Sequence, residues 1–256
     1  MTQPLSRSSV RPGNATKFSG RIACFAIPAG FCLFFAAVDG LATEPATVSQ
    51  QTREFRVSVD GKPRGEQTME ISRRSDGSEV MRGEVEVVLN FVVYRYRYAS
   101  SGTEVWKDGR LIQLANEADF NGDKYVLQAS ATQQALQYEV NGETQKAPSD
   151  ISVSSYWREP DAKHVGKSIR LLDSDKGRQM TATVERVGPA KIKVGADSIK
   201  ATHYRMRGDV EVDVWYDQQG LIARQESVES GHKTLLELTK IQKVAAKPEQ
   251  PGLIAR

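Results

Sequence analysis

The residues with the clearest potential for ligand chemistry form a run at positions 94–98, which reads Tyr-Arg-Tyr-Arg-Tyr. Successive side chains of a strand point to opposite faces, so Tyr94, Tyr96 and Tyr98 would share one face and the two arginines the other. The tyrosine face could contact a hydrophobic ligand, and the arginines could hold an anionic group. Aromatic residues also favour strands for packing alone, and a core or interface role is the simpler interpretation of the run taken by itself.

Further candidates are large aromatic residues and one histidine in segments with strand-like or irregular patterns. Each offers a flat apolar surface, and the histidine adds a group that can exchange a proton near neutral pH. The predicted ligand-binding set is Tyr94, Tyr96, Tyr98, Trp106, Trp157, His203 and Trp215.

Catalytic motifs are absent from the sequence. The three histidines, His164, His203 and His232, are not spaced as metal ligands, and there is no Gly-x-Ser-x-Gly motif. We therefore predict no catalytic residues, no metal and no cofactor. A hydrolase of envelope glycans or esters stays open as an alternative, using His203 or a carboxylate pair such as Glu84 and Glu86, because such pairs are defined by distance and not by spacing.

The N-terminal segment has the pattern of an export signal. Basic residues reach Arg21, an apolar stretch covers 22–38, and Gly40-Leu41-Ala42 places small residues where a signal peptidase cleaves. We predict a signal peptide at 1–42 and a periplasmic or secreted mature chain. The alternative is an uncleaved anchor to the inner membrane through residues 22–38, although that stretch is short for a span.

Removal of this segment would change both the cysteine content and the charge. Both cysteines, Cys24 and Cys32, lie within it, so the mature chain would have no disulfide and no thiol chemistry. The full chain has 35 basic and 32 acidic residues, and positions 1–42 hold four of the basic and one of the acidic. The remainder is neutral, which argues against a nucleic-acid partner. The sequence gives no indication of oligomeric state.

From position 53 to 243 the sequence shows short alternating runs separated by turn residues, such as the hairpin signal Asn141-Gly142. This pattern predicts an all-β domain, an antiparallel meander forming a curved sheet, half-barrel or sandwich. Residues 43–52 are predicted to be a spacer and residues 244–256 a disordered tail. The long apolar run at 80–100 should break near Leu89-Asn90 because strands are usually much shorter. Residues 147–166 fit no period and predict a long loop with one helical turn near Ser155.

A turn pattern occurs twice. Val105-Trp106 leads into Asp108-Gly109, and Val214-Trp215 leads through Asp217 to Gly220. The pattern could mark an internal duplication, but two copies without further alignment favour a recurrent hairpin.

The sequence resembles a family of exported bacterial proteins of unknown function with a Trp-Tyr-Asp turn signature. The resemblance is carried by these two motifs and by Tyr156-Trp157, Leu171-Leu172-Asp173 and the Thr202–Gly208 segment. The resemblance covers about residues 90–240. It implies an all-β periplasmic domain, and it brings no assigned activity. The fold is similar by analogy to the half-barrel of lipoprotein-carrier proteins, which does not establish a function.

The leading hypothesis from the sequence is a non-catalytic envelope protein that binds a hydrophobic or lipid-like ligand in a curved β-sheet. The hydrolase is the first alternative. A structural or scaffolding β-module is the second, and a closed sandwich without a cavity would favour it.

Overall fold

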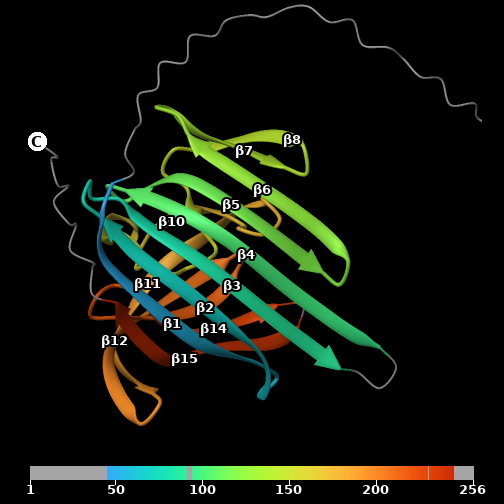
Figure 1. The fold of residues 1–256 in the computed structure, drawn as a ribbon, viewed down its shortest axis with the longest axis vertical. Helices are drawn as coiled ribbons and strands as arrows, with labels where there is room; N and C mark the ends of the chain where they lie inside the picture. The colour runs from blue at the N-terminus through green and yellow to red at the C-terminus, as the bar shows by residue number, and fades with distance from the viewer. Residues whose placement is uncertain (1–44, 91–93, 230, 245–256) are drawn as a thin grey trace, which may run out of the picture. The chain divides into compact units, whose positions relative to one another are not determined.

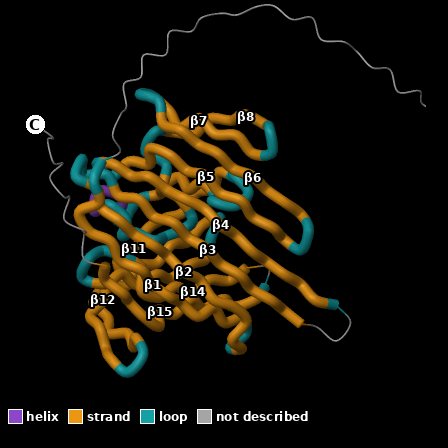
Figure 2. Tube along the Cα trace, viewed as in Figure 1, coloured by secondary structure: helices purple, strands orange, loops and turns teal. Residues whose placement is uncertain are grey.

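The fold is a single sheet of 15 strands in the part of the chain that the structure, a computed structural model, describes: residues 45–90, 94–229 and 231–244 (Figure 1). Strands and their tight turns account for most of it (Figure 2). The strands are β1 Thr47–Val59, β2 Lys62–Arg74, β3 Glu79–Asn90, β4 Arg95–Lys107, β5 Arg110–Phe120, β6 Asp123–Ala131, β7 Ala135–Val140, β8 Glu143–Pro148, β9 Ser152–Val153, β10 Ser168–Leu172, β11 Gln179–Val194, β12 Asp197–Gly208, β13 Glu211–Asp217, β14 Ile222–Glu229 and β15 His232–Val244.

The strands follow one another as an antiparallel meander, with two departures. The order across the sheet is β8-β7-β6-β5-β4-β3-β2-β1-β15-β14-β13-β12-β11-β10-β9, so the first strand pairs with the last. The short β9 pairs with β10 in parallel. The sheet is not closed, because β8 and β9 lie at its two edges. The predicted all-β, curved antiparallel meander is confirmed.

Tight turns with left-handed backbone set the hairpin registers. Asn141 and Gly142 have φ values of 49° and 91°, the two positive angles that a type I′ turn needs. They join β7 to β8 in the register Val140 opposite Glu143. The predicted break in the 80–100 run is confirmed as well, because β3 ends at Asn90 and pairs there with Arg95 of β4.

The predicted spacer is wrong over part of its length, because β1 begins at Thr47. Residues 47–52 are polar, so no apolar alternation marked them as strand. Their backbone nevertheless pairs on both sides: Gln51 lies opposite Ile71 of β2 and Lys243 of β15. Ladder hydrogen bonds need only backbone groups, so a polar strand is stable between two neighbours. The predicted signal peptide and most of the predicted tail, 245–256, lie outside the described residues.

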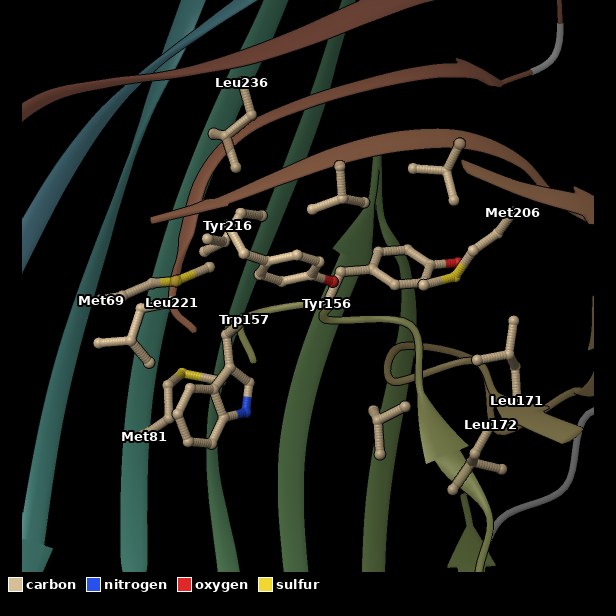
Figure 3. Packing of buried hydrophobic residues seen from close by; sticks show 14 of the residues in the cluster. Met69, Met81, Tyr156, Trp157, Leu171, Leu172, Met206, Tyr216, Leu221 and Leu236 are labelled. Atoms are coloured by element: carbon tan, nitrogen blue, oxygen red, sulfur yellow. The ribbon is translucent and has the colours of Figure 1, made fainter. Parts of the chain in front are cut away.

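The sheet curls around one hydrophobic core that both halves of the meander supply. Met69 and Met81 come from β2 and β3, while Tyr216 and Leu236 come from β13 and β15, and all four belong to the same buried cluster. In Figure 1 the early strands cross in front of the late ones, and Figure 3 shows the side chains between them. Burial of this apolar surface is the main contribution that holds the curled sheet together.

The segment 149–167 between β8 and β10, which we call the plug, is irregular apart from the two-residue β9 and carries buried side chains into the curl. Its backbone is fixed to the β13–β14 turn, since Glu159 N donates to Gly220 O at 2.8 Å and Ile222 N donates to Trp157 O at 3.0 Å. The predicted helical turn near Ser155 is wrong. One 3-10 turn occurs later, at Ala162–His164, where the Asp161 side chain accepts from Lys163 N. Ser154 and Ser155 form a tight turn instead, and buried Tyr156 and Trp157 follow it.

No helix among residues 45–90, 94–229 and 231–244 is long and apolar enough to cross a membrane.

Candidate functional site

A cavity of about 170 Å³ lies between the plug and the sheet. Four aromatic residues from three parts of the chain form much of its wall. We call it the plug cavity, and the residues that define it for the argument are Trp106, Tyr156, Trp157, Arg158 and Tyr216, with Ile169, Leu171 and Met206 completing the apolar side.

A buried carboxylate fixes two of the walls. The indole Nε1 atoms of Trp106 and Trp157 both donate to Oε2 of Glu104, at 2.7 and 2.8 Å. Trp106 follows Glu104 by two positions on β4, so both side chains point into the core, while Trp157 reaches the same oxygen from the plug. Burial raises the pKa of Glu104, and hydrogen bonds from Ser155 and the two indoles oppose the rise. The carboxylate therefore joins plug to sheet and sets the indole orientations.

Tyr216 contributes a polar group that no protein atom satisfies. The residue is 0% exposed, and its hydroxyl is the one buried side-chain atom without a hydrogen-bond partner in the described part of the chain. Figure 3 shows the ring extending from β13 toward Tyr156 of the plug. Buried hydroxyls are nearly always hydrogen-bonded in native proteins, and each exception calls for an explanation such as an unseen ligand or water.

Tyr156 has strained backbone. Its φ is 48°, in the left-handed region that favours glycine, and its side chain is only 8% exposed. The other four non-glycine residues with positive φ are Asp or Asn at turns, which tolerate this conformation. Strain at a bulky residue has a free-energy cost and is concentrated at ligand-binding and catalytic sites. Here it directs an aromatic ring into the plug cavity.

Arg158 provides the positive charge of the plug cavity. Its guanidinium carbon lies 4.8 Å from the centroid of the Trp106 ring and 5.7 Å from that of Trp157. Arg158 also forms an ion pair with Glu79, in which Nη2 lies 3.6 Å from Oε2. The Arg158 side chain is 28% exposed. The guanidinium is thus held over two aromatic faces by cation–π contacts.

Two neighbouring groups are already hydrogen-bonded. The Tyr204 hydroxyl donates to Oε1 of Glu159 at 2.6 Å. Burial and then this bond raise the pKa of Tyr204 to about 12, so the phenol stays protonated and keeps the Glu159 carboxylate oriented. Both residues thus support the plug from the β12 side.

The predicted tyrosine face is divided in the structure. Tyr94 precedes β4 and is 54% exposed, Tyr96 is partly buried, and Tyr98 points inward. The Tyr98 hydroxyl donates to Oδ2 of Asp175 at 2.7 Å, while Ser100 and Asn116 donate to Oδ1. The three tyrosines therefore do not form one ligand-facing stripe, and none of them lines the plug cavity.

Asp175 is a residue that sequence reasoning missed. The Asp173–Gly177 segment reads as a solvated turn, but it folds into the concave side of the sheet. Burial raises the pKa of Asp175, against hydrogen bonds from Tyr98, Ser100 and Asn116 that stabilise its ionised form. The next residue, Lys176, places its Nζ 4.1 Å from the centroid of the Phe120 ring. This turn closes the β4–β6 side of the interior.

His203 and Trp215 alternate with the buried Tyr204 and Tyr216 on their strands, and Trp215 is partly buried against the hydrophobic core. They are cross-strand partners, with ring centroids 4.2 Å apart and planes 6° apart. His203 Nε2 lies 2.6 Å from Oδ1 of Asp213. Burial raises the pKa of Asp213, but hydrogen bonds from Arg207 and His203 outweigh it and leave that pKa below 3.8. Neither ring belongs to the wall of the plug cavity.

The predicted set is thus brought together only in part: Trp106 and Trp157 meet at the plug cavity. Sequence reasoning missed Glu104, Tyr156, Arg158 and Tyr216. Alternation on β13 was the available signal, because it places Tyr216 on the face opposite Trp215. Among the described residues, no group of three or more His, Cys, Asp or Glu is placed to hold a metal ion.

Comparison with known proteins assigns the family. Residues 55–239 match the model of a domain of unknown function, DUF6134. The chain belongs to the DUF6134 family. The matched range of this DUF6134 domain contains the plug, the four aromatic cavity residues and Glu104. A search of proteins with curated descriptions finds no match.

One solved structure supports the fold of the DUF6134 domain. It is the crystal structure of a β-barrel-like protein of the domain of unknown function DUF1849 from Brucella abortus. The two share 10% sequence identity at a TM-score of 0.56, and the similarity covers 78% of this chain and 99% of that one. At this identity the likeness concerns the fold alone, and it agrees with a barrel-like curled sheet.

Proposed function

We propose that this DUF6134 domain is a non-catalytic protein of the cell envelope that binds a hydrophobic or lipid-like ligand in the plug cavity. The observation that carries the proposal is the unpartnered Tyr216 hydroxyl, which is fully buried beside an aromatic-walled cavity. An apolar chamber with a small number of placed polar groups is the usual form of a small-molecule site. The strained backbone of Tyr156 gives independent support for the same location.

The cavity size limits what can enter. About 170 Å³ is below the range of roughly 300–1,000 Å³ typical of drug-sized ligands, and close to a cavity of about 150 Å³ that accepts benzene. The ligand, or the part of it that inserts, is therefore a single ring or a short aliphatic chain. A long acyl chain along the whole concave face would require the plug to move.

Binding explains the polar groups around the cavity better than catalysis does. Glu104 accepts from two indoles, and Glu159 accepts from Tyr204. His164 also lies at the cavity wall, but within the described residues its ring forms no hydrogen bond with a serine hydroxyl. His203 does not line the plug cavity, so the hydrolase alternative loses the histidine that it invoked.

Titration calorimetry with 1-hexanol and benzyl alcohol tests the binding proposal. Both probes match the cavity in size, and saturable binding at one site is expected. Ile169→Phe adds bulk to the cavity wall and should abolish binding, whereas Val228→Phe adds the same bulk to a residue of β14 that is 45% exposed and should not. Absence of binding by both probes, or equal binding by both variants, would contradict the proposal.

The envelope location rests on the sequence of residues 1–42 and has its own test. Expression in a bacterial host followed by fractionation and intact-mass measurement should recover a periplasmic chain that begins after Ala42. Native mass spectrometry of the same material should show a ligand adduct. Recovery of full-length chain from the cytoplasm would contradict export without affecting the cavity argument.

A further inference from the structure

We propose that the ligand of the plug cavity is a small amphipathic carboxylate, with its apolar part between the aromatic walls and its carboxylate on Arg158. The inference rests on the function proposed above and adds the chemical class of the ligand. Its basis is that two residues with unfilled hydrogen-bonding capacity line the same chamber: Tyr216, whose buried hydroxyl has no partner among the described residues, and Arg158.

Arg158 forms a long ion pair with Glu79 and lies close enough to the buried Glu104 to act on it electrostatically. Its side chain is 28% exposed, and no hydrogen bond to its guanidinium occurs among the described residues. The 3.6 Å approach to Glu79 is too long for a hydrogen bond, and Oε1 of Glu79 accepts from Arg73 Nε at 2.9 Å. The guanidinium lies over the rings of Trp106 and Trp157, and its fork of N–H donors matches the geometry of a planar anion.

The carboxylates near the cavity each have partners of their own. Asp161 accepts from Lys163 N at 3.0 Å and lies 3.1 Å from Lys163 Nζ. Glu159 accepts from Tyr204, and burial of Glu104 raises its pKa, which favours its neutral form. The contact of Arg158 with Glu79, at 3.6 Å, is longer than those of Glu159 and Asp161 with their partners, so its guanidinium is the group of the cavity wall that can take an incoming anion.

The chamber and the arginine together define the class. A single ring or short chain fits about 170 Å³, and a carboxylate matches the bidentate geometry of a guanidinium. The Tyr216 hydroxyl lies on the β13 side, where it can donate to an oxygen of the inserted group. Short-chain fatty acids and simple aromatic acids combine these features.

Hexanoate, 1-hexanol and hexylamine provide matched probes because they share one chain and differ in head group. Titration calorimetry of the wild-type chain should show hexanoate binding more tightly than 1-hexanol, and hexylamine binding weakest. Arg158→Gln should weaken hexanoate by about tenfold or more and 1-hexanol by a much smaller factor. Arg170→Gln, at an exposed position of β10, should change neither. Raising the ionic strength should weaken hexanoate alone.

The outcomes separate the inference from the proposed function. If 1-hexanol binds and hexanoate binds no more tightly, the carboxylate inference is overturned and the hydrophobic binding site remains. The same conclusion follows if Arg158→Gln does not change the affinity for hexanoate. Preference for hexylamine overturns it in favour of the acidic residues. Failure of all three probes overturns both. If Arg158→Gln does not fold, Arg158→Lys can replace it, because lysine keeps the positive charge and lacks the bidentate donor geometry of the guanidinium. It should weaken the binding of hexanoate by less than about tenfold.

Discussion

Arg53 of β1 and Asp217 at the end of β13 form an ion pair inside the protein, with Nη2 2.5 Å from Oδ2. The Arg53 side chain is 0% exposed, and its Nη1 also donates to Ile222 O at 2.8 Å. The aspartate of the Trp-Tyr-Asp signature thus connects the first strand to a turn some 160 residues later, and its second oxygen accepts from Gln219 N within the turn.

Breaking this pair should destabilise the fold strongly. Asp217→Ala leaves a buried guanidinium without its counter-charge, which costs about 3–5 kcal/mol in comparable buried pairs. Urea unfolding of the two proteins measures the difference. Glu86→Gln removes a partner of the exposed Arg97 and should have little effect, since such surface pairs contribute little. Equal effects of the two substitutions would show that Asp217 is not a buried structural contact.

Tyr216→Phe should separate stability from binding. The substitution removes a buried hydroxyl that lacks a protein partner, so the free energy of unfolding should stay the same or rise by up to about 1 kcal/mol. Affinity for 1-hexanol or hexanoate should fall, because in the wild-type complex the Tyr216 hydroxyl would be the hydrogen-bond partner of the ligand. Thermal unfolding and calorimetry on the same samples give both quantities. Marked destabilisation without ligand would mean that the hydroxyl has a structural partner such as an ordered water.

Glu104→Gln should flatten the dependence of stability on pH. Burial raises the folded-state pKa of Glu104 above its ordinary 4.5, so the folded chain holds this proton more tightly than the unfolded chain does. That contribution is complete below pH 4.5 and is lost as the pH rises through the folded-state pKa. Glutamine stays neutral and can still accept from both indoles. Urea unfolding from pH 4 to 8 should show wild type losing stability relative to Glu104→Gln as pH increases, and a constant difference would exclude the effect.

Gly177→Ala should be far more harmful than Gly61→Ala. Both glycines have left-handed φ, 67° and 74°, so both substitutions carry a similar backbone strain of about 1 kcal/mol. A Cβ at Gly177 would lie 2.3 Å from a methyl of Val140 and 2.8 Å from one of Leu127, whereas one at Gly61 meets nothing within 4 Å. Chemical denaturation should show an added loss of about 1–3 kcal/mol for Gly177→Ala. Equal losses would place the Asp173–Gly177 turn outside the concave interior.

Sequence reasoning recovered the fold because the fold is local. Each hairpin carries its own alternation and turn residues, as the Asn141-Gly142 turn does, so the meander can be read one pair of strands at a time. The start of β1 was not predicted because Gln50 and Gln51 join the sheet through their backbone hydrogen bonds. The pattern of side chains carries no information about such pairing.

The site was only partly predictable because it depends on contacts between distant segments. Trp106 and Trp157 were chosen as large aromatics, but their common acceptor, Glu104, becomes apparent only when the plug enters the curl. The two Val-Trp motifs show this: Trp106 is buried in the first, whereas Val214 is buried in the second and Trp215 only partly so. This difference in phase also counts against an internal duplication.

The seam between β1 and β15 has a kinetic consequence. Gln50 lies opposite Val244, so the contacts that complete the sheet join residues at nearly the greatest separation in the described chain. Closing so large a loop is entropically slow, whereas the hairpins on either side can form early. The polypeptide emerging from the ribosome therefore carries an unsealed β1 edge until residue 244 arrives, and during that interval chaperones or neighbouring chains have access to it.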